Sequence, residues 1–447
     1  MGTESLKQAA YTEALQEARG ASPENGEAGG ELSPKEFKKL FMKFSGMSIS
    51  FWFSFCFCSY LTIFLQSIGW DSVRVGIINS LNNAVGVFST PFWGTISDKL
   101  RSIKKILIIL IIASAVTYFL IPFVDVSVLG ISLLFIVIPF SNFFRMPLSS
   151  LIDNWTVRAC NKHGMNFGAI RSTGSVSFGI VGITLGFVIT KINEVTQSNK
   201  GTRLTFTLFA VSIFILLLVV MSIEDDLNSR SAKRLRFRDM HFGELFKNYY
   251  YMTYLVYAMV IQVPLACVYA FLPYLMSEVN VDSATIGYIT GFKAFIEVPM
   301  LLLMDRVRNK VPLYYLLFAS GALYMGEALG YSLCTGFWGI LAISTLQGLA
   351  GGLHIAAGSN YVATLAPADL KATAQTLNGS MVSLAGIIGN LAGGFIIAAL
   401  GIRIFYRLAA VLILFGLIFY IGSFPFGERV LHIPKPKIQK HGVGISH

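Results

Sequence analysis

Seven ionisable side chains lie within long apolar stretches of this chain, where a charge is costly to bury. They are Arg145, Asp153, Arg171, Lys293, Glu297, Glu327 and His354. An ionisable group in such a stretch is by default a candidate for solute binding or proton transfer. Their spacing along the chain predicts which of them meet.

The first predicted pair is Asp153 and Arg171, which stand equally far from Lys162 in a predicted turn. Residues equally far from the turn of an antiparallel helical hairpin lie at the same depth, so this carboxylate and guanidinium are able to meet. They either form a bidentate ion pair or offer donors and acceptors to a bound solute. The alternative is a structural ion pair that ties two helices together.

The second predicted group contains Lys293 and Glu327, which are equally far from Lys310, and Glu297, one helical turn after Lys293. One lysine then faces two glutamates in a medium of low dielectric constant, which leaves one carboxylate poorly neutralised. A carboxyl that exchanges its proton near neutral pH is what proton coupling requires. Glu297 is the candidate proton carrier and Glu327 the second choice, and a static network is the alternative.

Each of two further residues, His354 and Arg145, has two possible roles. His354 lies in the glycine-rich stretch LQGLAGGLHIAAGSNY and is either hydrogen-bonded to a neighbouring backbone or part of a proton relay. Arg145 lies two helical turns before Asp153. It either lines the same cavity or extends along it towards the membrane surface.

The composition predicts the elements that must position these residues. The 447 residues are 54% hydrophobic and only 13% charged, with 41 glycines and a mean hydropathy of +0.64. Soluble domains carry about 25% charged residues, so a soluble enzyme, a disordered scaffold and a secreted disulfide module are excluded. The chain is predicted to be an all-α, multi-pass membrane protein.

A bilayer-spanning helix needs about 20 apolar residues, and this chain has room for twelve such spans. Residues 1–40 are predicted to be a disordered polar segment, 224–247 a cytoplasmic linker and 425–447 a basic cytoplasmic tail. Two six-helix halves then occupy residues 41–223 and 248–424. The predicted spans lie near residues 44–66, 75–97, 103–122, 129–158, 165–190, 203–223, 249–275, 283–304, 312–334, 337–362, 373–398 and 402–424.

The net charge of +11 follows the predicted topology. With both termini placed in the cytoplasm, cytoplasmic segments hold 24 Lys and Arg residues and external connectors hold 6. This asymmetry is the positive-inside rule, so the basic excess requires no nucleic-acid partner. The five cysteines have no spacing typical of a metal site or a disulfide framework, and no cofactor or metal is expected.

A loop motif follows the second predicted span. The segment GTISDKL matches G-x-x-[SA]-D-[KR], and LLLMDRVRNKVP after the eighth span repeats its acid and the basic residues that follow. Asp98 and Asp305 are thus predicted gating residues, because a carboxylate at a helix end can pair with a cation or a helix terminus and latch one conformation. The motif resembles that of the major facilitator superfamily. This resemblance implies two six-helix bundles around a central cavity, built from inverted repeats.

Further segments resemble one branch of that superfamily, the lactose permease-like proton symporters of oligosaccharides, nucleosides and phenylpropionate. FGAIRSTGSVSF (167–178) resembles the sugar-site segment of the fifth span, which implies substrate binding by Arg171, with Asp153 as its acidic partner and Phe178 stacking on the solute. FIEVP (295–299) resembles a segment with a substrate-binding glutamate, which implicates Glu297. LQGLAGG and APADLKATAQTL resemble spans ten and eleven of the phenylpropionate-type relatives.

The chain also departs from that branch. Gln347 and Ala350 stand where lactose permease has a histidine and a proton-carrying glutamate, and Glu327 stands where relatives have an arginine. Lactose itself is therefore not expected as the solute, and a proton relay is expected around Lys293, Glu297 and Glu327, with assistance from His354.

These observations predict a proton-coupled importer of a small polar organic solute, above all a sugar, oligosaccharide or glycoside. It is expected to act as a monomer in a bacterial plasma membrane. Nucleosides and aromatic acids are alternative solutes, and a free Arg145 favours an acid. Proton-driven export is a second class and a non-transporting sensor a third. The spans contain no Gly-x-Ser-x-Gly or His-Glu-x-x-His motif, so an enzyme is not expected.

Overall fold

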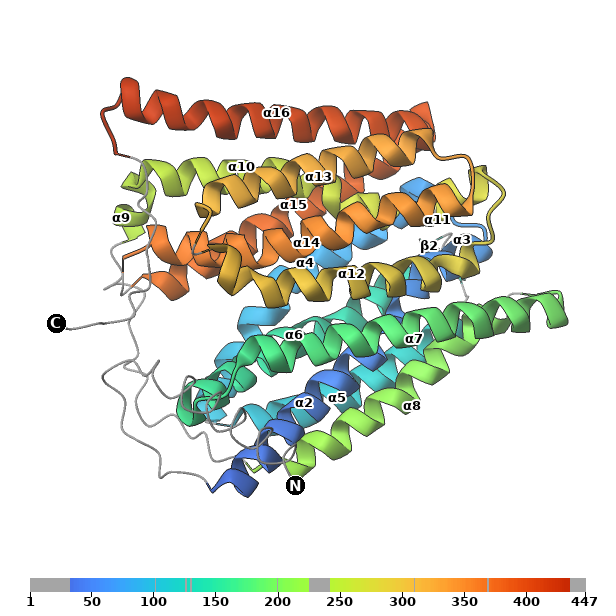
Figure 1. The fold of residues 1–447 in the computed structure, drawn as a ribbon. Coiled ribbons are helices and arrows are strands. Elements are labelled where there is room, and N and C mark those ends of the chain that lie inside the picture. Colours follow the sequence, from blue (N-terminus) through green and yellow to red (C-terminus); the bar gives the residue numbers. More distant parts are fainter. Residues whose placement is uncertain are drawn as a thin grey trace, which may run out of the picture.

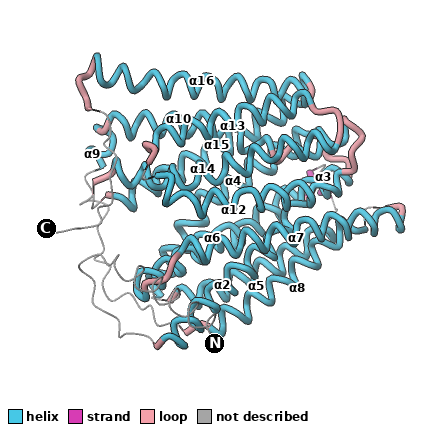
Figure 2. The backbone as a smooth tube through the Cα atoms, viewed as in Figure 1, coloured by secondary structure: helices cyan, strands magenta, loops and turns pink. Residues whose placement is uncertain are grey.

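The computed structural model describes residues 33–434, except 101, 125–126, 129–130, 199, 225–241, 309 and 368–369. Nearly all of this part is helical, as Figure 2 shows. The strands within it are β1 (Ser127–Val128) and β2 (Ile131–Ser132), which form a short antiparallel hairpin. The all-α prediction is confirmed.

The helices form two bundles (Figure 1). In the first bundle the helices are α2 (Pro34–Cys56) with η1 (Phe57–Tyr60) and α3 (Leu61–Ser67), α4 (Ser72–Leu100), α5 (Ile103–Leu120) with η2 (Ile121–Phe123), α6 (Leu134–His163), α7 (Phe167–Thr196) and α8 (Lys200–Ser222). In the second they are α9 (Phe242–Lys247), α10 (Tyr249–Val268) with α11 (Leu272–Glu278), η4 (Ser283–Thr285) with α12 (Ile286–Arg308), α13 (Leu313–Leu333), α14 (Phe337–Leu365), α15 (Lys371–Leu400) and α16 (Ile402–Arg429).

Nine helical segments of the described residues are long and apolar enough to cross a membrane. Helices α4, α12 and α13, with 29, 23 and 21 residues, are long enough but more polar. Nine and three together match the twelve predicted spans. Helices α4 and α12 each pack against the other bundle.

The first and last spanning helices are longer than the predicted spans. Helix α2 begins at Pro34, within the segment 1–40, because Ser33 and Glu36 form a capping box and Pro34 suits the first helical position. Helix α16 continues to Arg429, within the segment 425–447. We call the side of the molecule where α2 begins and α16 ends the terminal side, and the other the opposite side.

The turn between α6 and α7 carries clear local signals. Gly164 ends α6 in the left-handed conformation, with φ at 67°, where glycine is favoured. Asn166 then caps α7 by accepting a hydrogen bond from the backbone N–H of Ala169. This tight hairpin brings Asp153 of α6 and Arg171 of α7 to similar depths, as their spacing predicts.

Two pairs of helices join the bundles, α7 with α12 and α4 with α15. The α7–α12 contact is made by backbones, since glycines face glycines. A Cβ atom on Gly182 would lie 2.9 Å from the carbonyl oxygen of Gly287 and from the Cα of Gly291. Such distances leave no room for any side chain, so glycine is required here.

Five hydrogen bonds between described residues link the bundles towards the opposite side. The donors and acceptors are the Tyr60 hydroxyl and Ala284 O (3.1 Å), Gln66 Nε2 and Ser277 Oγ (2.9 Å), the Ser72 hydroxyl and Gly394 O (3.0 Å), the Ser80 hydroxyl and Ile387 O (2.9 Å), and the Tyr274 hydroxyl and Trp70 O (2.9 Å). In Figure 1 the bundles approach each other at the right, the opposite side, and their ribbons diverge towards the left. The structure is therefore a conformer closed on the opposite side.

Gly182→Val is expected to disfavour this closed conformer by about 1–3 kcal/mol, because the new side chain meets backbone atoms that cannot rotate away. Spin labels at Val195 and Trp338, 82% and 78% exposed on the opposite side of the two bundles, should then report a longer mean distance in a background without the native cysteines. Gly422→Val is the matched control, since a Cβ there meets no atom within 4 Å. An unchanged distance in the Gly182 variant would contradict the conclusion that the glycine contact between α7 and α12 holds the bundles closed on the opposite side.

Candidate functional site

The Arg171 guanidinium lies where the two bundles meet. It stacks over the Trp52 indole, 4.0 Å from the ring centroid, and its Nη1 donates to the Ser175 hydroxyl at 3.3 Å. It also interacts electrostatically with Asp153 of its own bundle and with Glu297 of α12 in the other. Arg171 is therefore a cation shared between acids of both bundles.

Asp153 and Arg171 do not form an ion pair with each other. Both side chains are half-buried, and the Asp153 carboxylate has no hydrogen bond to another described residue. Their interaction acts over a longer distance, because the guanidinium is drawn to the Trp52 ring instead. Of the arrangements that the spacing allows, the direct ion pair between these two described side chains is therefore not formed.

Trp52 of α2 is a site residue that the sequence analysis missed. Its ring also makes an edge contact with Phe178, at 6.2 Å between centroids and 72° between planes. Gly174, one turn after Arg171, makes room for this arrangement. A Cβ on Gly174 would lie 2.6 Å from Ser48 Oγ and 3.1 Å from Trp52 Cγ. A glycine one turn from a candidate arginine is the signal that could have indicated a large neighbouring ring.

A second polar cluster is buried inside the second bundle around Glu327 of α13, whose side chain is 0% exposed. The Tyr269 hydroxyl donates to Glu327 Oε1, while Glu327 Oε2 is buried without a partner among the described residues. Lys293 Nζ lies over the Tyr269 ring, 4.2 Å from its centroid. Tyr269 thus joins the lysine to the glutamate.

Lys293 interacts electrostatically with both Glu297 and Glu327 but forms an ion pair with neither. Glu297 is half-buried and has no hydrogen bond to another described residue. The three residues that the sequence analysis grouped are therefore close enough to influence one another's charge. Tyr269, the second missed residue, lies at the break between α10 and α11, and no pattern in the sequence distinguishes it from other aromatic residues.

His354 and Arg145 lie apart from these groups. His354 Nδ1 is 3.4 Å from the Ser320 hydroxyl, so the histidine is held by its own bundle rather than by the glutamates. The Arg145 guanidinium donates to Asn142 Oδ1 at 2.8 Å and lies beside the rings of Phe55 and Tyr118, at 5.4 and 5.5 Å from the centroids. No described carboxylate pairs with it.

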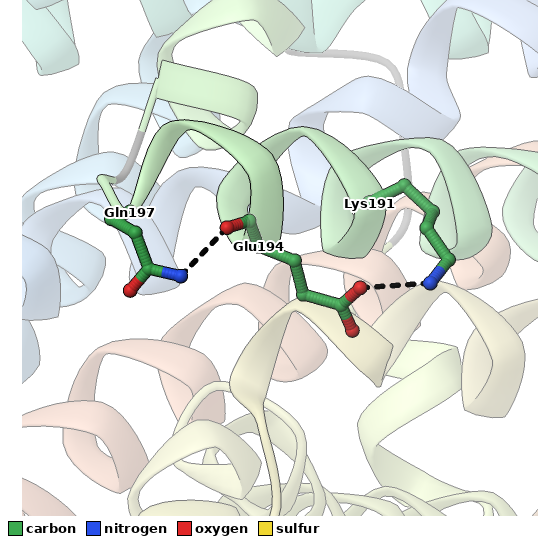
Figure 3. A network of polar contacts seen from close by, with 3 residues as sticks. All are labelled: Lys191, Glu194 and Gln197. Carbon is green, nitrogen blue, oxygen red and sulfur yellow. Dashed lines mark hydrogen bonds and ion pairs between the residues drawn. The ribbon is translucent and has the colours of Figure 1, made fainter.

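The side chains of the predicted gating residues Asp98 and Asp305 lie outside the described part of the structure. Within the described residues, no three His, Cys, Asp or Glu side chains are grouped so as to hold a metal ion. Figure 3 shows a contrasting polar network at the end of α7. There Glu194 pairs with Lys191 at 2.8 Å and its backbone oxygen accepts from Gln197, all at the exposed surface. Such exposed pairs contribute little to stability.

Together the two clusters offer hydrogen-bonding groups where the bundles meet and a buried carboxyl behind them. A solute with several hydroxyl groups can accept from Arg171 and donate to Asp153 and Glu297. The flat faces of Trp52 and Phe178 can stack on an apolar ring face. The buried Glu327 can hold a proton out of contact with water.

Comparisons with known proteins agree over most of the chain. The model of the MFS_1 like family matches residues 44–408. The uncharacterised transporter YwbF of Bacillus subtilis is 23% identical over 367 residues, 81% of this chain and 88% of YwbF. The maltose permease of Geobacillus stearothermophilus is 23% identical over 372 residues, 81% of this chain and 87% of the permease.

Solved structures show the same fold. A mutant of the nucleoside transporter NupG superposes with a TM-score of 0.73 at 17% identity, covering 87% of this chain and 100% of that chain. The human organic anion transporter MFSD10 superposes with a TM-score of 0.57 at 13% identity, again covering 87% of this chain and 100% of the other.

Tyr269→Phe is expected to lower the stability of the purified protein by about 1–3 kcal/mol, because it removes the hydroxyl that donates to Glu327 Oε1 in an apolar interior. The measurement is the midpoint of thermal unfolding. Tyr315→Phe on the same bundle, with the Tyr315 side chain 57% exposed, is the control. In a double-mutant cycle, Glu327→Gln should remove most of the loss, and two additive effects would contradict a direct link between the two side chains.

Proposed function

The chain belongs to the MFS_1 like family, and from this premise we propose that it is a proton-coupled symporter that imports a small polar organic solute, above all a sugar, oligosaccharide or glycoside. That it is a multi-pass membrane transporter of the major facilitator superfamily follows from the family itself. The observation that carries the finer proposal is the position of Arg171, which interacts with Asp153 and Glu297 from different bundles without pairing with either.

A solute in this position would link the bundles. Its hydroxyl groups would accept from Arg171 and donate to the two carboxylates, replacing the hydrogen bonds it loses to water. Trp52 and Phe178 would stack on its ring, and the 23% identity to a maltose permease supports a sugar. Because acceptors and donors come from both bundles, a bound solute favours their approach, as alternating access requires.

We assign the role of proton carrier to Glu327. In the sequence analysis Glu297 is the first candidate and Glu327 the second. Glu327 is fully buried with one unpaired oxygen, whereas Glu297 is half-buried and faces Arg171. An unpaired buried carboxylate is costly, and protonation removes that charge. We therefore assign solute binding to Glu297 and proton binding to Glu327, with Lys293 and Tyr269 between them and His354 in no direct role.

The sign of the linkage favours symport. Lys293 is able to neutralise one of its two glutamates at a time. When Glu327 takes up a proton, Lys293 balances the charge of Glu297 alone. Glu297 is then not drawn into an ion pair with Arg171, so the N–H groups of Arg171 stay available to the solute. Proton binding thus strengthens solute binding, and by reciprocity the solute strengthens proton binding.

From the positive-inside rule we infer that the terminal side faces the cytoplasm. Both termini would then be cytoplasmic and the closed, opposite side external, in the plasma membrane of a bacterium. Residues 41–223 and 248–424 would move as two units of a monomer, joined by the linker 224–247, with Asp98 and Asp305 latching the cytoplasmic side. Residues 1–40 and 425–447 would flank these units.

A nucleoside is the second candidate solute, on one observation. Trp52 and Phe178 present two aromatic rings beside a guanidinium. This arrangement suits the stacking of a planar base as well as that of a sugar ring. An aromatic acid would instead be expected to use Arg145, which pairs with no described carboxylate but is enclosed by Phe55 and Tyr118.

Proteoliposomes that contain a pH-sensitive dye test the coupling. Sugars, glycosides, nucleosides and aromatic acids are added one at a time to wild type, Glu327→Gln and Glu297→Gln. Wild type should acidify the lumen with its solute. Glu327→Gln should abolish acidification but still exchange labelled solute, and Glu297→Gln should lose both because solute binding fails.

The control for this assay is Glu194→Gln, whose carboxylate is at the exposed end of α7. Unimpaired proton movement in Glu327→Gln would mean that Glu327 is not the proton carrier, and Glu297 would again be the candidate. Drug-dependent alkalinisation under an imposed gradient, without acidification by any solute, would replace import with export.

Arg171→Lys is expected to weaken solute binding at least roughly tenfold, because an ammonium neither stacks flat on Trp52 nor donates through a planar fork. The dissociation constant of the solute found above, measured by calorimetry, reports the change. Arg74→Lys, on the exposed start of α4, is the matched control. Equal affinities of wild type and the Arg171 variant would remove Arg171 from the binding site.

A further inference from the structure

A groove lies on the terminal side, between the start of α2 and the end of α8, and takes no part in the proposed transport. Its volume is about 520 Å³. The two helix ends that form it lie next to each other at the lower left of Figure 1. It is lined by Lys35, Lys38, Lys39, Met42, Lys43, Gly46, Val219 and Ser222.

The α2 residues of the groove recur every three or four positions, so they form one stripe along one face of the helix. Lys35, Lys38 and Lys39 are exposed. Lys43, deeper in the groove, donates to the Ser222 backbone oxygen at 2.6 Å and so joins α2 to the end of α8. Three ammonium groups therefore stand at the mouth of the groove without a protein acceptor among the described residues.

Among the residues that the structure describes, the acids nearest to this stripe do not neutralise it. Glu36 accepts from the Ser33 hydroxyl and backbone N–H in the helix cap, although it also attracts Lys39. Glu224, just beyond α8, is exposed and forms no ion pair with the groove lysines. Counted over the described side chains, the mouth of the groove thus carries a positive excess.

At the deeper end of the groove, apolar groups lie beside Lys43, whose ammonium is already bonded to the Ser222 backbone oxygen. Met42 is 62% exposed, and Gly46 lies beside Val219 of α8, since a Cβ on Gly46 would lie 3.8 Å from Val219 Cγ1. From Lys35 to Gly46, within about three turns of one helix, the lining therefore changes from three ammonium groups without a described acceptor to Met42, Gly46 and Val219, beside a lysine that is already bonded. The same change takes place in a lipid leaflet between headgroup and acyl chain.

We propose that this groove binds one anionic phospholipid. Lys35, Lys38 and Lys39 hold its phosphate, and the start of an acyl chain lies along Met42, Gly46 and Val219. Basic pockets beside spanning helices are suited to anionic headgroups, and each lysine near the surface adds to the attraction. A soluble phosphate would satisfy the lysines but leave the apolar end without a partner, so the lipid fits the whole groove better.

Native mass spectrometry of the full-length purified protein tests this proposal. The probes are phosphatidylglycerol, phosphatidylcholine with the same acyl chains, and inorganic phosphate. Wild type should retain one phosphatidylglycerol in preference to phosphatidylcholine. The variant K35Q/K38Q/K39Q should lose this retention at least roughly tenfold. The matched control, K105Q/K247Q/K310Q, removes three other exposed lysines and should retain the lipid.

A second variant keeps every charge. Gly46→Leu fills the apolar end of the groove and should also weaken retention, at least roughly fivefold, while size-exclusion profiles check that all variants fold. The proposal fails if both lipids are retained equally, if the two triple variants lose the same amount, or if Gly46→Leu binds like wild type. It also fails if inorganic phosphate displaces the lipid, since the groove would then bind free phosphate.

Discussion

The structure depends on the high free energy of an unpaired charge in a medium of low dielectric constant. In water, the distances from Arg171 and Lys293 to the neighbouring carboxylates would have little effect on the free energy, because solvent would solvate and screen each charged group separately. Within spanning helices, each charge must be stabilised by a neighbour. The chain does so with the faces of Trp52 and Tyr269 rather than with direct ion pairs.

This choice keeps the acids available. A tight Asp153–Arg171 pair would satisfy both groups and leave nothing for a solute to bind, since replacing a buried pair is costly. A ring face stabilises the cation while leaving its N–H groups free to donate. An aromatic partner therefore suits a site that must be filled and emptied repeatedly better than a carboxylate partner does.

The spans and the depths of charged residues could be predicted from the sequence, because both depend on distances along the chain. Equal spacing from a turn places Asp153 and Arg171 at similar depths, and it groups Lys293 with Glu327. Depth does not determine the direction in which a side chain points around the helix axis. For that reason the spacing did not reveal Trp52 or Tyr269, which lie outside the two hairpins. Aromatic residues make up 13% of the chain, too many for any one to be singled out without coordinates.

The glycine contact between α7 and α12 has a consequence for the history of this chain. Any single-nucleotide change that alters a glycine codon introduces a residue with a side chain or a stop. At Gly182 every such residue would enter space that is already filled by the backbone of α12. Most positions of a helix can drift through near-neutral intermediates, but this position has none within one mutational step. The direct backbone contact between α7 and α12 therefore cannot change by successive near-neutral substitutions at Gly182. A side chain at this position would be accommodated only if α12 changed at the same time.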